Sequence, residues 1–335
     1  MEKYSQYRDR GSGIAPFFPI STPSSYLSLP FHTFLFLIRL PILISFSLSY
    51  FLFLQWLPIG PLGRKASLWL ILGTPGVWWI DLQIDGVKKG SLAKHHLPRL
   101  PHPSSIIACS FTSPLDALYL AAIFDPIFTA SYPSTRLVQR ISLLHAILRA
   151  FSSPQPHPPR NASLVPLTSL LKQYANQPIV VFPECTTTNG RGILPFAPSL
   201  LTVGANTKIF PISLRYTAPD ITTPIPHTYL SLLWNLLSKP THCIRVRIAE
   251  SVVQNPRASA AGLHDESREE RASSSDTLLG SEEGGESMTA GERRVLDRVA
   301  EALARLGRVK RVGLGVRDKE GFVRAWRKEK GWWWG

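Results

Sequence analysis

The sequence predicts an α/β fold, a mixed sheet covered by helices and preceded by a membrane-anchoring helical hairpin. Three observations support this prediction: an apolar run without charges near the N-terminus, short apolar runs that alternate with segments of helical spacing in the middle, and then a polar stretch rich in Ser, Gly, Glu and Asp. Strands that alternate with helices are typical of a sheet with helices on its faces. The expected organisation is a disordered tail over 1–29, an anchor over 30–82, the α/β domain over 83–254, a disordered linker over 255–290, and a basic amphipathic helix with a tail over 291–335.

The composition limits the classes of protein that fit. The chain has 335 residues, of which 44% are hydrophobic, so it is long enough for a real core and is not disordered as a whole. Its formal net charge of +14 predicts an anionic partner, which could be nucleic acid, an acidic membrane surface or a phosphorylated substrate. Three cysteines are too few and too scattered for a disulfide framework, which favours a reducing, cytosol-facing location.

The N-terminal third favours a membrane among these anionic partners. From Leu40 to Gly63 no residue is charged, whereas Arg39 precedes the run and Arg64 follows it. About 20 apolar helical residues cross a hydrocarbon core of roughly 30 Å. The next apolar stretch, Ser67–Ile80, holds three tryptophans but is interrupted by glycine and proline, so we expect an interfacial or re-entrant segment there. Tight membrane association is the prediction, and a buried helix of a globular protein is the alternative.

The middle of the chain predicts the sheet and its first helices. Apolar runs of strand length are expected as strands, and segments with apolar residues at helical spacing are expected as helices. The expected strands are Ile106–Cys109, Ile179–Phe182, Ile209–Leu214 and Ile244–Ile248, and the expected helices are Leu115–Ile123 and Leu167–Tyr174.

The segment after the polar stretch predicts an amphipathic helix. Thr289 and Glu292 have the spacing of a capping box, apolar residues from Val295 to Leu306 form one stripe, and Gly307 is placed to end the helix. Basic residues and tryptophans follow. Such a segment suits RNA as well as anionic lipid, but behind a membrane anchor we expect lipid, where each basic residue contributes about 1 kcal/mol. A solvated basic tail is the remaining alternative.

The stretch Ile179–Arg191 is the most informative for chemistry. An apolar strand is followed by a proline, a carboxylate, three hydroxyls, an amide, a glycine and an arginine. Such a loop gathers hydrogen-bond donors around one guanidinium, which matches a phosphate monoester in charge and geometry. A second polar stretch, Ser110–Asp116, follows the strand at Ile106, and Thr112 or Ser113 is expected to cap the next helix.

These two stretches resemble the glycerolipid acyltransferase family, which includes the lysophosphatidic acid and lysophosphatidylcholine acyltransferases. The family's FPEGT block matches Phe182–Thr186 at four of five positions, and the Asn-Gly-Arg that ends at Arg191 resembles the fungal lysophosphatidic-acid-acyltransferase-like branch. The family's NHxSxxD block matches at Ser113 and Asp116. A strand with a central proline, Pro211, resembles a third block, and the likeness covers about residues 66–253.

The resemblance implies a glycerol-phosphate acyltransferase-like fold and transfer of a long-chain acyl group from acyl-CoA to a lysophospholipid, above all lysophosphatidic acid. In the family, a His–Asp pair activates the acceptor hydroxyl, and the FPEGT loop with nearby arginines holds the acceptor's phosphate. By resemblance, the expected catalytic residues are Asp116 and Ser113, and the expected substrate-binding residues are Phe182, Pro183, Glu184, Thr186, Asn189 and Arg191. Neither a metal nor a cofactor is implied, because acyl-CoA is a co-substrate.

Two positions depart from the family's blocks. The histidine of the first block is Phe111 here, and a phenyl ring cannot take a proton. Loss of a general base costs about 10²- to 10⁴-fold in rate. We expect Phe111 to pack apolarly where the imidazole would stand, while Asp116 keeps a structural role at the helix N-terminus. Cys185 replaces the glycine of the second block, and a small semi-buried side chain is expected there, not a catalytic thiol.

The expected role is in phospholipid and triacylglycerol synthesis, at the endoplasmic reticulum membrane or the lipid droplet, with the α/β domain facing the cytosol. The expected partners are membrane lipids, acyl-CoA and a lysophospholipid, and no nucleic acid. Two other classes stay open: a catalytically impaired relative that binds lipid or serves as a membrane scaffold, and a basic RNA-binding protein. The missing histidine favours the first of these, unless a connector histidine such as His95, His96 or His102 supplies the base.

Overall fold

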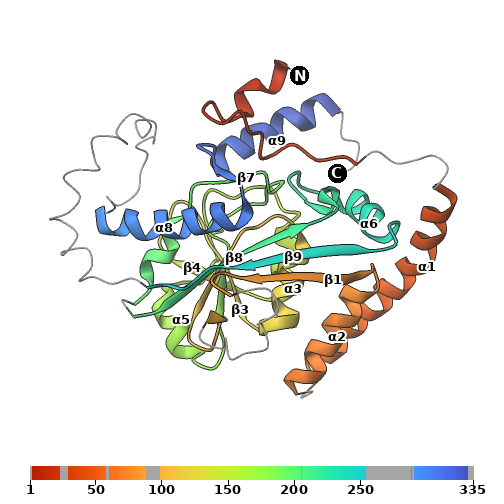
Figure 1. The fold of residues 1–335 in the computed structure, drawn as a ribbon, viewed down its shortest axis with the longest axis horizontal. Helices are drawn as coiled ribbons and strands as arrows, with labels where there is room; N and C mark the ends of the chain where they lie inside the picture. The colour runs from red at the N-terminus through yellow and green to blue at the C-terminus, as the bar shows by residue number, and fades with distance from the viewer. Residues whose placement is uncertain are drawn as a thin grey trace.

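A computed structural model describes residues 2–22, 29–57, 60–87, 99–204, 206–253, 288 and 290–330. Across these residues the centre is a nine-stranded sheet in the order β1-β9-β8-β2-β6-β3-β4-β5, with β10 paired to β8 (Figure 1). The strands are β1 Val77–Ile84, β2 Ile106–Cys109, β3 Ile127–Ala130, β4 Val138–Ile141, β5 Leu164–Val165, β6 Ile179–Val181, β8 Lys208–Tyr216, β9 His242–Ile248 and β10 Val252–Val253.

The middle of the sheet is parallel. β2 lies between β6 and β8 and runs parallel to both, with Ile106 in register with Ile179 on one side and Ile209 on the other. These strands are buried on both faces, as strands between two helical layers must be. β9 runs antiparallel to β8, and β4 runs antiparallel to β3, so the sheet is mixed. The predicted fold class is confirmed.

Helices cover both faces of the sheet. One core joins Ile107 and Cys109 of β2 to α2, α3 and α4, and the other joins Ile106 and Ala108 to α5 and α8. Neighbouring residues of β2 enter opposite cores because side chains alternate along a strand. The helices are α1 Leu29–Leu48, α2 Pro61–Gly73, α3 Pro114–Phe124, α4 Leu143–Arg149, α5 Leu167–Gln173, α6 Tyr229–Leu237, α8 Ala290–Gly307 and α9 Val316–Lys330.

The apolar N-terminal run forms α1 and the π-helical turns Ser49–Leu54 that continue it. Together Leu29–Leu54 are 26 residues, and their most apolar 18-residue window has a mean hydropathy of 1.9 and is 6% buried. In the part of the chain that the structure describes, this is the one helix long and apolar enough to cross a membrane. It packs beside α2 and α6 at one end of the molecule (Figure 1). Its exposed apolar surface suggests membrane association.

The prediction for Ser67–Ile80 is wrong in its second half. α2 ends at Gly73, and the chain turns into β1, so Trp78 and Trp79 lie on an edge strand and not on a re-entrant segment. The turn requires glycine, because Gly76 has a φ of +85° and a Cβ there would come within 2.4 Å of a carbonyl oxygen. The expected border between anchor and domain at 82–83 therefore falls inside a strand that pairs with β9.

The N-terminal segment, expected as part of a disordered tail, is folded from 2 to 22. It begins with the 3-10 helix Glu2–Tyr7, and Phe17 is fully buried. Tyr4, Phe17 and Phe18 form an aromatic cluster with Phe322 of α9, at the top of Figure 1. The sequence pattern predicted disorder because these few aromatic residues find their partner only in a segment far along the chain.

The C-terminal helices α8 and α9 pack on the α/β domain and on the N-terminal segment, while their expected binding to anionic lipid stays a prediction. The predicted apolar stripe of α8 is buried, with Leu296 and Val299 in the second core, and the helix ends at Gly307 as predicted. Arg215 and Arg247 donate hydrogen bonds to the last carbonyl groups of α8, where cations interact favourably with the helix dipole. Residues 255–287, which make up most of the expected linker, and Thr289 lie outside the described residues.

Candidate active site

The polar stretches singled out in the sequence meet at one edge of the sheet. β2, β6 and β8 are parallel, so their carboxyl ends lie side by side. β2 leads into Ser110–Ser113 and the start of α3, β6 leads into the loop 182–191, and β8 ends at Tyr216. In open α/β sheets, ligands bind beyond the carboxyl ends of strands, so this edge is the candidate site.

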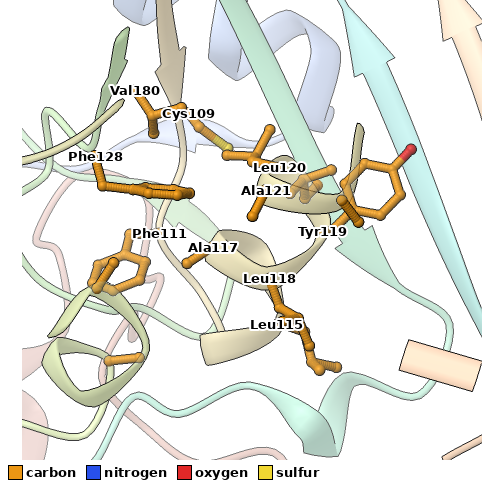
Figure 2. Close-up of a cluster of buried hydrophobic side chains, with 14 of the residues drawn as sticks. Cys109, Phe111, Leu115, Ala117, Leu118, Tyr119, Leu120, Ala121, Phe128 and Val180 are labelled. Carbon is orange, nitrogen blue, oxygen red and sulfur yellow. The ribbon is translucent and has the colours of Figure 1, made fainter. Parts of the chain in front are cut away.

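Phe111 is part of the core next to this edge. Its side chain is 1% exposed and stacks on Phe182, with ring centroids 4.4 Å apart and planes at 25°. Figure 2 shows Phe111 among apolar side chains of α3 and the neighbouring strands, including Phe128 and Val180. An aromatic pair of this kind adds about 0.5–1.5 kcal/mol to the burial of the rings. The expected apolar packing of Phe111 is confirmed.

Asp116 is fully buried in the first turn of α3. Its Oδ2 accepts hydrogen bonds from the Thr112 N–H at 2.6 Å, the Ser113 N–H at 2.9 Å and the Thr112 hydroxyl at 3.1 Å. Its Oδ1 accepts a hydrogen bond from the Tyr216 hydroxyl. Burial raises the pKa of Asp116 to about 6, although these hydrogen bonds oppose the shift. The group is therefore ionised at neutral pH but close to the pH at which it takes a proton.

Ser113 is the N-cap of α3. Its Oγ accepts a hydrogen bond from the Leu115 N–H at 3.4 Å and donates one to the Ile221 carbonyl oxygen at 2.9 Å. Ser113 and Asp116 form a capping box, with Pro114 at the first helical position. The Ser113 side chain also interacts by a hydrogen bond with Tyr216, so Ser113 caps α3 next to the polar groups of the site, and its catalytic role stays a prediction.

Glu184 lies behind the site and does not reach its surface. The side chain is 1% exposed, and Oε2 accepts a hydrogen bond from the Leu194 N–H at 3.2 Å. Burial raises the pKa of Glu184 to about 8, so most of the carboxyl is protonated at neutral pH. A neutral, buried carboxyl orders the loop 182–191 from inside, which differs from the acceptor contact that the resemblance implied.

A lysine from the C-terminal helix closes the loop 182–191 from the other side. Lys319 of α9 is fully buried, and its Nζ donates to the Thr186 hydroxyl at 2.9 Å, the Thr187 hydroxyl at 2.9 Å and the Thr187 carbonyl oxygen at 2.6 Å. These three acceptors match the three donors of an ammonium group. Burial lowers the pKa of Lys319 to about 7, and the Glu184 carboxyl opposes the shift.

Asn189 holds the N-terminal segment over the loop. Its backbone N–H donates to the Pro16 carbonyl oxygen at 2.9 Å, and its Nδ2 donates to the carbonyl oxygens of Ala15 at 2.8 Å and Phe18 at 2.9 Å. Asn189 and Thr186 were both expected to bind substrate. Their polar groups tie the loop to the two terminal segments, which leaves the expected substrate binding a prediction.

Cys185 has the backbone conformation that glycine supplies in the family's block. Its φ is +59°, in the left-handed region that side chains with a Cβ disfavour. The side chain is buried against Ala197 and against Val316, the first residue of α9. Burial raises the pKa of the thiol to about 12, so no reactive thiolate forms at neutral pH. The expected burial of this small side chain is confirmed, and its lack of a catalytic role stays a prediction.

A cavity of about 240 Å³ opens beside Asp116. Thr112 and Tyr216 line it and are both hydrogen-bonded to Asp116, so the carboxylate lies one hydrogen bond away from the cavity. Arg191 and Arg215 give the wall its positive charge. Of the six expected substrate-binding residues, Asn189 and Arg191 line this cavity, whereas Phe182, Pro183, Glu184 and Thr186 do not.

Comparison with known proteins identifies fungal relatives, although no protein-family model matches the chain. A Schizosaccharomyces pombe protein whose name provisionally assigns it as a lysophosphatidic acid:oleoyl-CoA acyltransferase is 27% identical over 253 residues, covering 74% of this chain and 84% of that protein. Lysophosphatidic acid:oleoyl-CoA acyltransferase 1 of Saccharomyces cerevisiae is 28% identical over 266 residues, covering 71% of this chain and 80% of that protein. The chain is a relative of these fungal acyltransferases. The resemblance found in the two motifs is confirmed.

One solved structure is also similar. It is the 1-acyl-sn-glycerophosphate (LPA) acyltransferase PlsC from Thermotoga maritima, with 13% sequence identity and a TM-score of 0.36, and the match covers 84% of this chain and 97% of that one.

In this relative of the fungal acyltransferases, three residues of the site were not identified from the sequence motifs. Arg215 and Tyr216 lie just beyond the predicted strand Ile209–Leu214, which the structure extends as β8 to Tyr216. Continuing the strand by two residues would have placed both at the carboxyl edge beside the other polar stretches. Lys319 has no such signal, because nothing in the sequence separates it from the other basic residues near the C-terminus.

Proposed function

We propose that the chain transfers a long-chain fatty acyl group from acyl-CoA to the free hydroxyl of a lysophospholipid, with lysophosphatidic acid as the acceptor. One observation carries the proposal: two arginines, Arg191 and Arg215, line the same cavity at the carboxyl edge of the sheet as Thr112 and Tyr216, which are hydrogen-bonded to a buried carboxylate. The names of the two fungal relatives give oleoyl-CoA and lysophosphatidic acid as the substrates of those proteins, which supports the same donor and acceptor here.

The wall of the cavity suits a phosphate monoester. A phosphate monoester carries about −1.5 to −2 charges near pH 7 and binds guanidinium groups through paired hydrogen bonds. The Arg191 N–H donates to Asn189 Oδ1 at 3.1 Å, so the start of the Arg191 side chain is fixed by the loop. Arg215 is oriented by its hydrogen bond to the Gly307 carbonyl oxygen at 2.5 Å. Two arginines in one cavity with the hydrogen-bond partners of a carboxylate favour an acceptor that has both a phosphate and a hydroxyl.

Acyl transfer from labelled oleoyl-CoA to lysophosphatidic acid, measured with the full-length protein in washed membranes, tests the proposal. Arg191→Ala is expected to raise the KM for lysophosphatidic acid at least 10-fold, because hydrogen bonds to charged groups contribute about 1.5–3 kcal/mol. The KM for oleoyl-CoA should stay nearly constant. Arg160→Ala, at an exposed arginine outside the cavity lining, is the matched control. An equal rise in both KM values, or the same change in the control, would sink the assignment.

Lipid binding without catalysis is the second candidate, and Phe111 at the position of the family's histidine is the observation that favours it. Such a protein would bind vesicles that contain lysophosphatidic acid and would transfer no oleoyl group above the rate of a heat-inactivated sample. Transfer that depends on Arg191 would exclude this candidate.

We also propose a location at the endoplasmic reticulum membrane or the lipid droplet, with the site facing the cytosol and serving phospholipid or triacylglycerol synthesis. The exposed apolar surface of α1 supports the membrane, and the free thiols of Cys109, Cys185 and Cys243 suit a reducing compartment. In intact microsomes, protease added from outside should digest the α/β domain. Protection of the domain until detergent is added would contradict this orientation.

A further inference from the structure

Phe111 cannot accept a proton from the substrate. The cavity contains another residue that can take this role. We infer that Tyr216 takes the proton from the acceptor hydroxyl while passing its own proton to Asp116. Tyr216 is then the catalytic residue that touches the substrate, and Asp116 holds the proton behind it. The inference rests on the proposed acyl transfer and names the groups that would perform its proton steps.

Tyr216 stands between the cavity and the buried carboxylate. Its side chain lines the cavity, and its hydroxyl donates to Asp116 Oδ1. Oδ2 of Asp116 is already held by the N–H groups of Thr112 at 2.6 Å and Ser113 at 2.9 Å, so the carboxylate is fixed with Oδ1 turned to Tyr216. Tyr216 is the last residue of β8, where it pairs with Ile244 of β9, and the earlier part of β8 pairs with β2. Both partners are thus positioned by the sheet and by the cap of α3, without a mobile loop.

Few other residues of the cavity could accept the proton in place of Tyr216. Among the described residues that line it there is no histidine, aspartate, glutamate or lysine. Thr112 is the rival that also bonds Asp116, because it lines the cavity and its hydroxyl donates to Asp116 Oδ2 at 3.1 Å. A phenol has a pKa near 10 and is a far better proton carrier than an aliphatic alcohol. Oδ2 already accepts two N–H groups, which makes it the poorer base of the two carboxylate oxygens.

The proton steps balance with acyl-CoA and the acceptor alone. The acceptor oxygen forms a bond to the thioester carbonyl carbon as its proton moves to Tyr216 Oη, and the phenolic proton moves to Asp116 Oδ1. The carbon–sulfur bond then breaks, and its electron pair stays on sulfur. Return of the proton from Asp116 through Tyr216 to the thiolate yields the CoA thiol and the ester and restores both residues.

The ionisable groups around Tyr216 and Asp116 are compatible with this proton transfer. Burial raises the pKa of Asp116 to about 6, so the carboxylate is ionised at pH 7 and can take a proton. Burial and the neighbouring Asp116 raise the pKa of Tyr216 well above its ordinary value, so no free phenolate forms. Glu184 and Cys109 also face Asp116, but burial raises the pKa of both, to about 8 for Glu184, and keeps them largely neutral at pH 7. The Glu184 carboxyl opposes the lowering of the Lys319 pKa, and Arg191 and Arg215 line the cavity.

The test compares Tyr216→Phe with wild-type protein in the oleoyl-CoA and lysophosphatidic acid assay. Tyr216→Phe keeps the ring and removes the hydroxyl, and kcat is expected to fall at least 10²-fold with less than about a threefold change in either KM. Asp116→Asn should lose a similar factor, and the double variant should be no slower than the slower single variant, because the two groups act as one unit. Wild-type kcat should fall below a pH near 6 and should decrease in D₂O. A structural role alone would move neither of these two readouts.

Two control variants separate the outcomes. Tyr119→Phe removes the hydroxyl of a buried tyrosine on α3 that does not line the cavity, and should keep kcat. Thr112→Val removes the rival hydroxyl, and a loss of kcat there with full activity in Tyr216→Phe would overturn the inference. If Tyr216→Phe does not fold, a wild-type profile without the acid limb near pH 6 or without a solvent isotope effect overturns it. Wild-type protein with no transfer to lysophosphatidic acid refutes the proposed function itself, whereas an active wild type and an equally active Tyr216→Phe refute the proton route alone.

Discussion

Helix α1 has apolar side chains along almost its whole length, and none of them is buried. Helix α9 is mostly charged, yet it buries Lys319 completely in the loop of the candidate site. Both helices run against the rule that apolar residues lie inside and charged residues outside. The surroundings account for the difference: exposed apolar area of this extent favours a hydrocarbon phase, and three acceptors offset part of the cost of burying the Lys319 amino group, whose pKa burial lowers to about 7.

The comparison teaches that burial depends on the surface opposite a helix as much as on the helix itself. α1 contacts α2 and α6 along only part of its circumference, so most of its apolar surface stays exposed. α9 meets the threonines of the loop 182–191 and the aromatic residues of the N-terminal segment, which together satisfy its one buried charge and its apolar face. Each of the four predictions below tests one side of this contrast.

The largest effect is expected at α1. Leu37→Glu, Ile44→Glu and Leu52→Glu together should move the protein from membranes to the soluble fraction, because each charge at a bilayer centre costs about 2.5–3.5 kcal/mol. All three side chains are exposed, so the α/β domain should keep its fold. Flotation with phospholipid vesicles measures the partition, and the same three positions changed to alanine serve as the control that stays bound. A triple-glutamate protein that still floats would show that α1 is not the anchor.

The second-largest effect is a loss of stability, expected from a substitution at Lys319. Lys319→Met keeps a chain of similar length but leaves the Thr186 and Thr187 acceptors without their donor, and each buried unpaired group costs about 1–3 kcal/mol. We expect the free energy of unfolding to fall by about 2–4 kcal/mol and α9 to become sensitive to protease. Lys328→Met, at an exposed position on the same helix, should change the free energy of unfolding by less than about 0.5 kcal/mol. Equal stability of the two variants would mean that the buried lysine contributes nothing.

The elements that the sequence predicted well are those specified locally. β2, β6 and α3 were placed within one or two residues, because apolar runs, Pro114 and the Ser113 cap are signals that a short window contains. β4 was missed because its four residues include Gln139 and Arg140 and show no apolar run. For the site, the same local signals found Asp116 and Arg191 but assigned surface roles to Glu184 and Thr186.

Residues whose roles depend on distant contacts could not be predicted. The hydrogen bond from Lys319 to Thr186 spans 133 residues of sequence, and that from Asn189 to Ala15 spans 174. No pattern within a helix or a loop encodes such pairs, so a basic helix and a polar N-terminus were both expected to be exposed. The burial of Phe17 has the same origin, since its partner Phe322 lies on α9.

A change of pH is expected to have a smaller effect on the free energy of unfolding. The pKa of Lys319 is lowered to about 7 in the folded protein and returns toward 10.5 on unfolding, so between these values the unfolded chain binds more protons. This contribution makes the free energy of unfolding rise with pH from about 7 to 10.5. Urea unfolding at pH 7.5 and pH 9.5 should therefore show a larger gain for the wild type than for Lys319→Met. The same gain in both proteins would assign the pH dependence to other groups.

The smallest effect lies where α9 meets the loop 182–191. Cys185→Gly removes the cost of a Cβ at φ +59°, about 1–2 kcal/mol, but also loses the contact with Val316. Cys185→Ala keeps the strained backbone and loses the sulfur. We expect Cys185→Gly to be more stable than Cys185→Ala by about 1 kcal/mol, the reverse of the usual order for these two residues. Thermal unfolding of both variants measures this, and the ordinary order would show that the backbone at 185 is not strained.

The order of segments along the chain gives the buried lysine a further consequence. The ribosome releases α1 before any strand of the described sheet, and it releases Lys319 after all of them. The loop 182–191 therefore receives the Lys319 donors only when α9 has emerged and folded back. A nascent chain halted before α9 has an incomplete site. The order of synthesis thus makes the last described helix the element that completes the site.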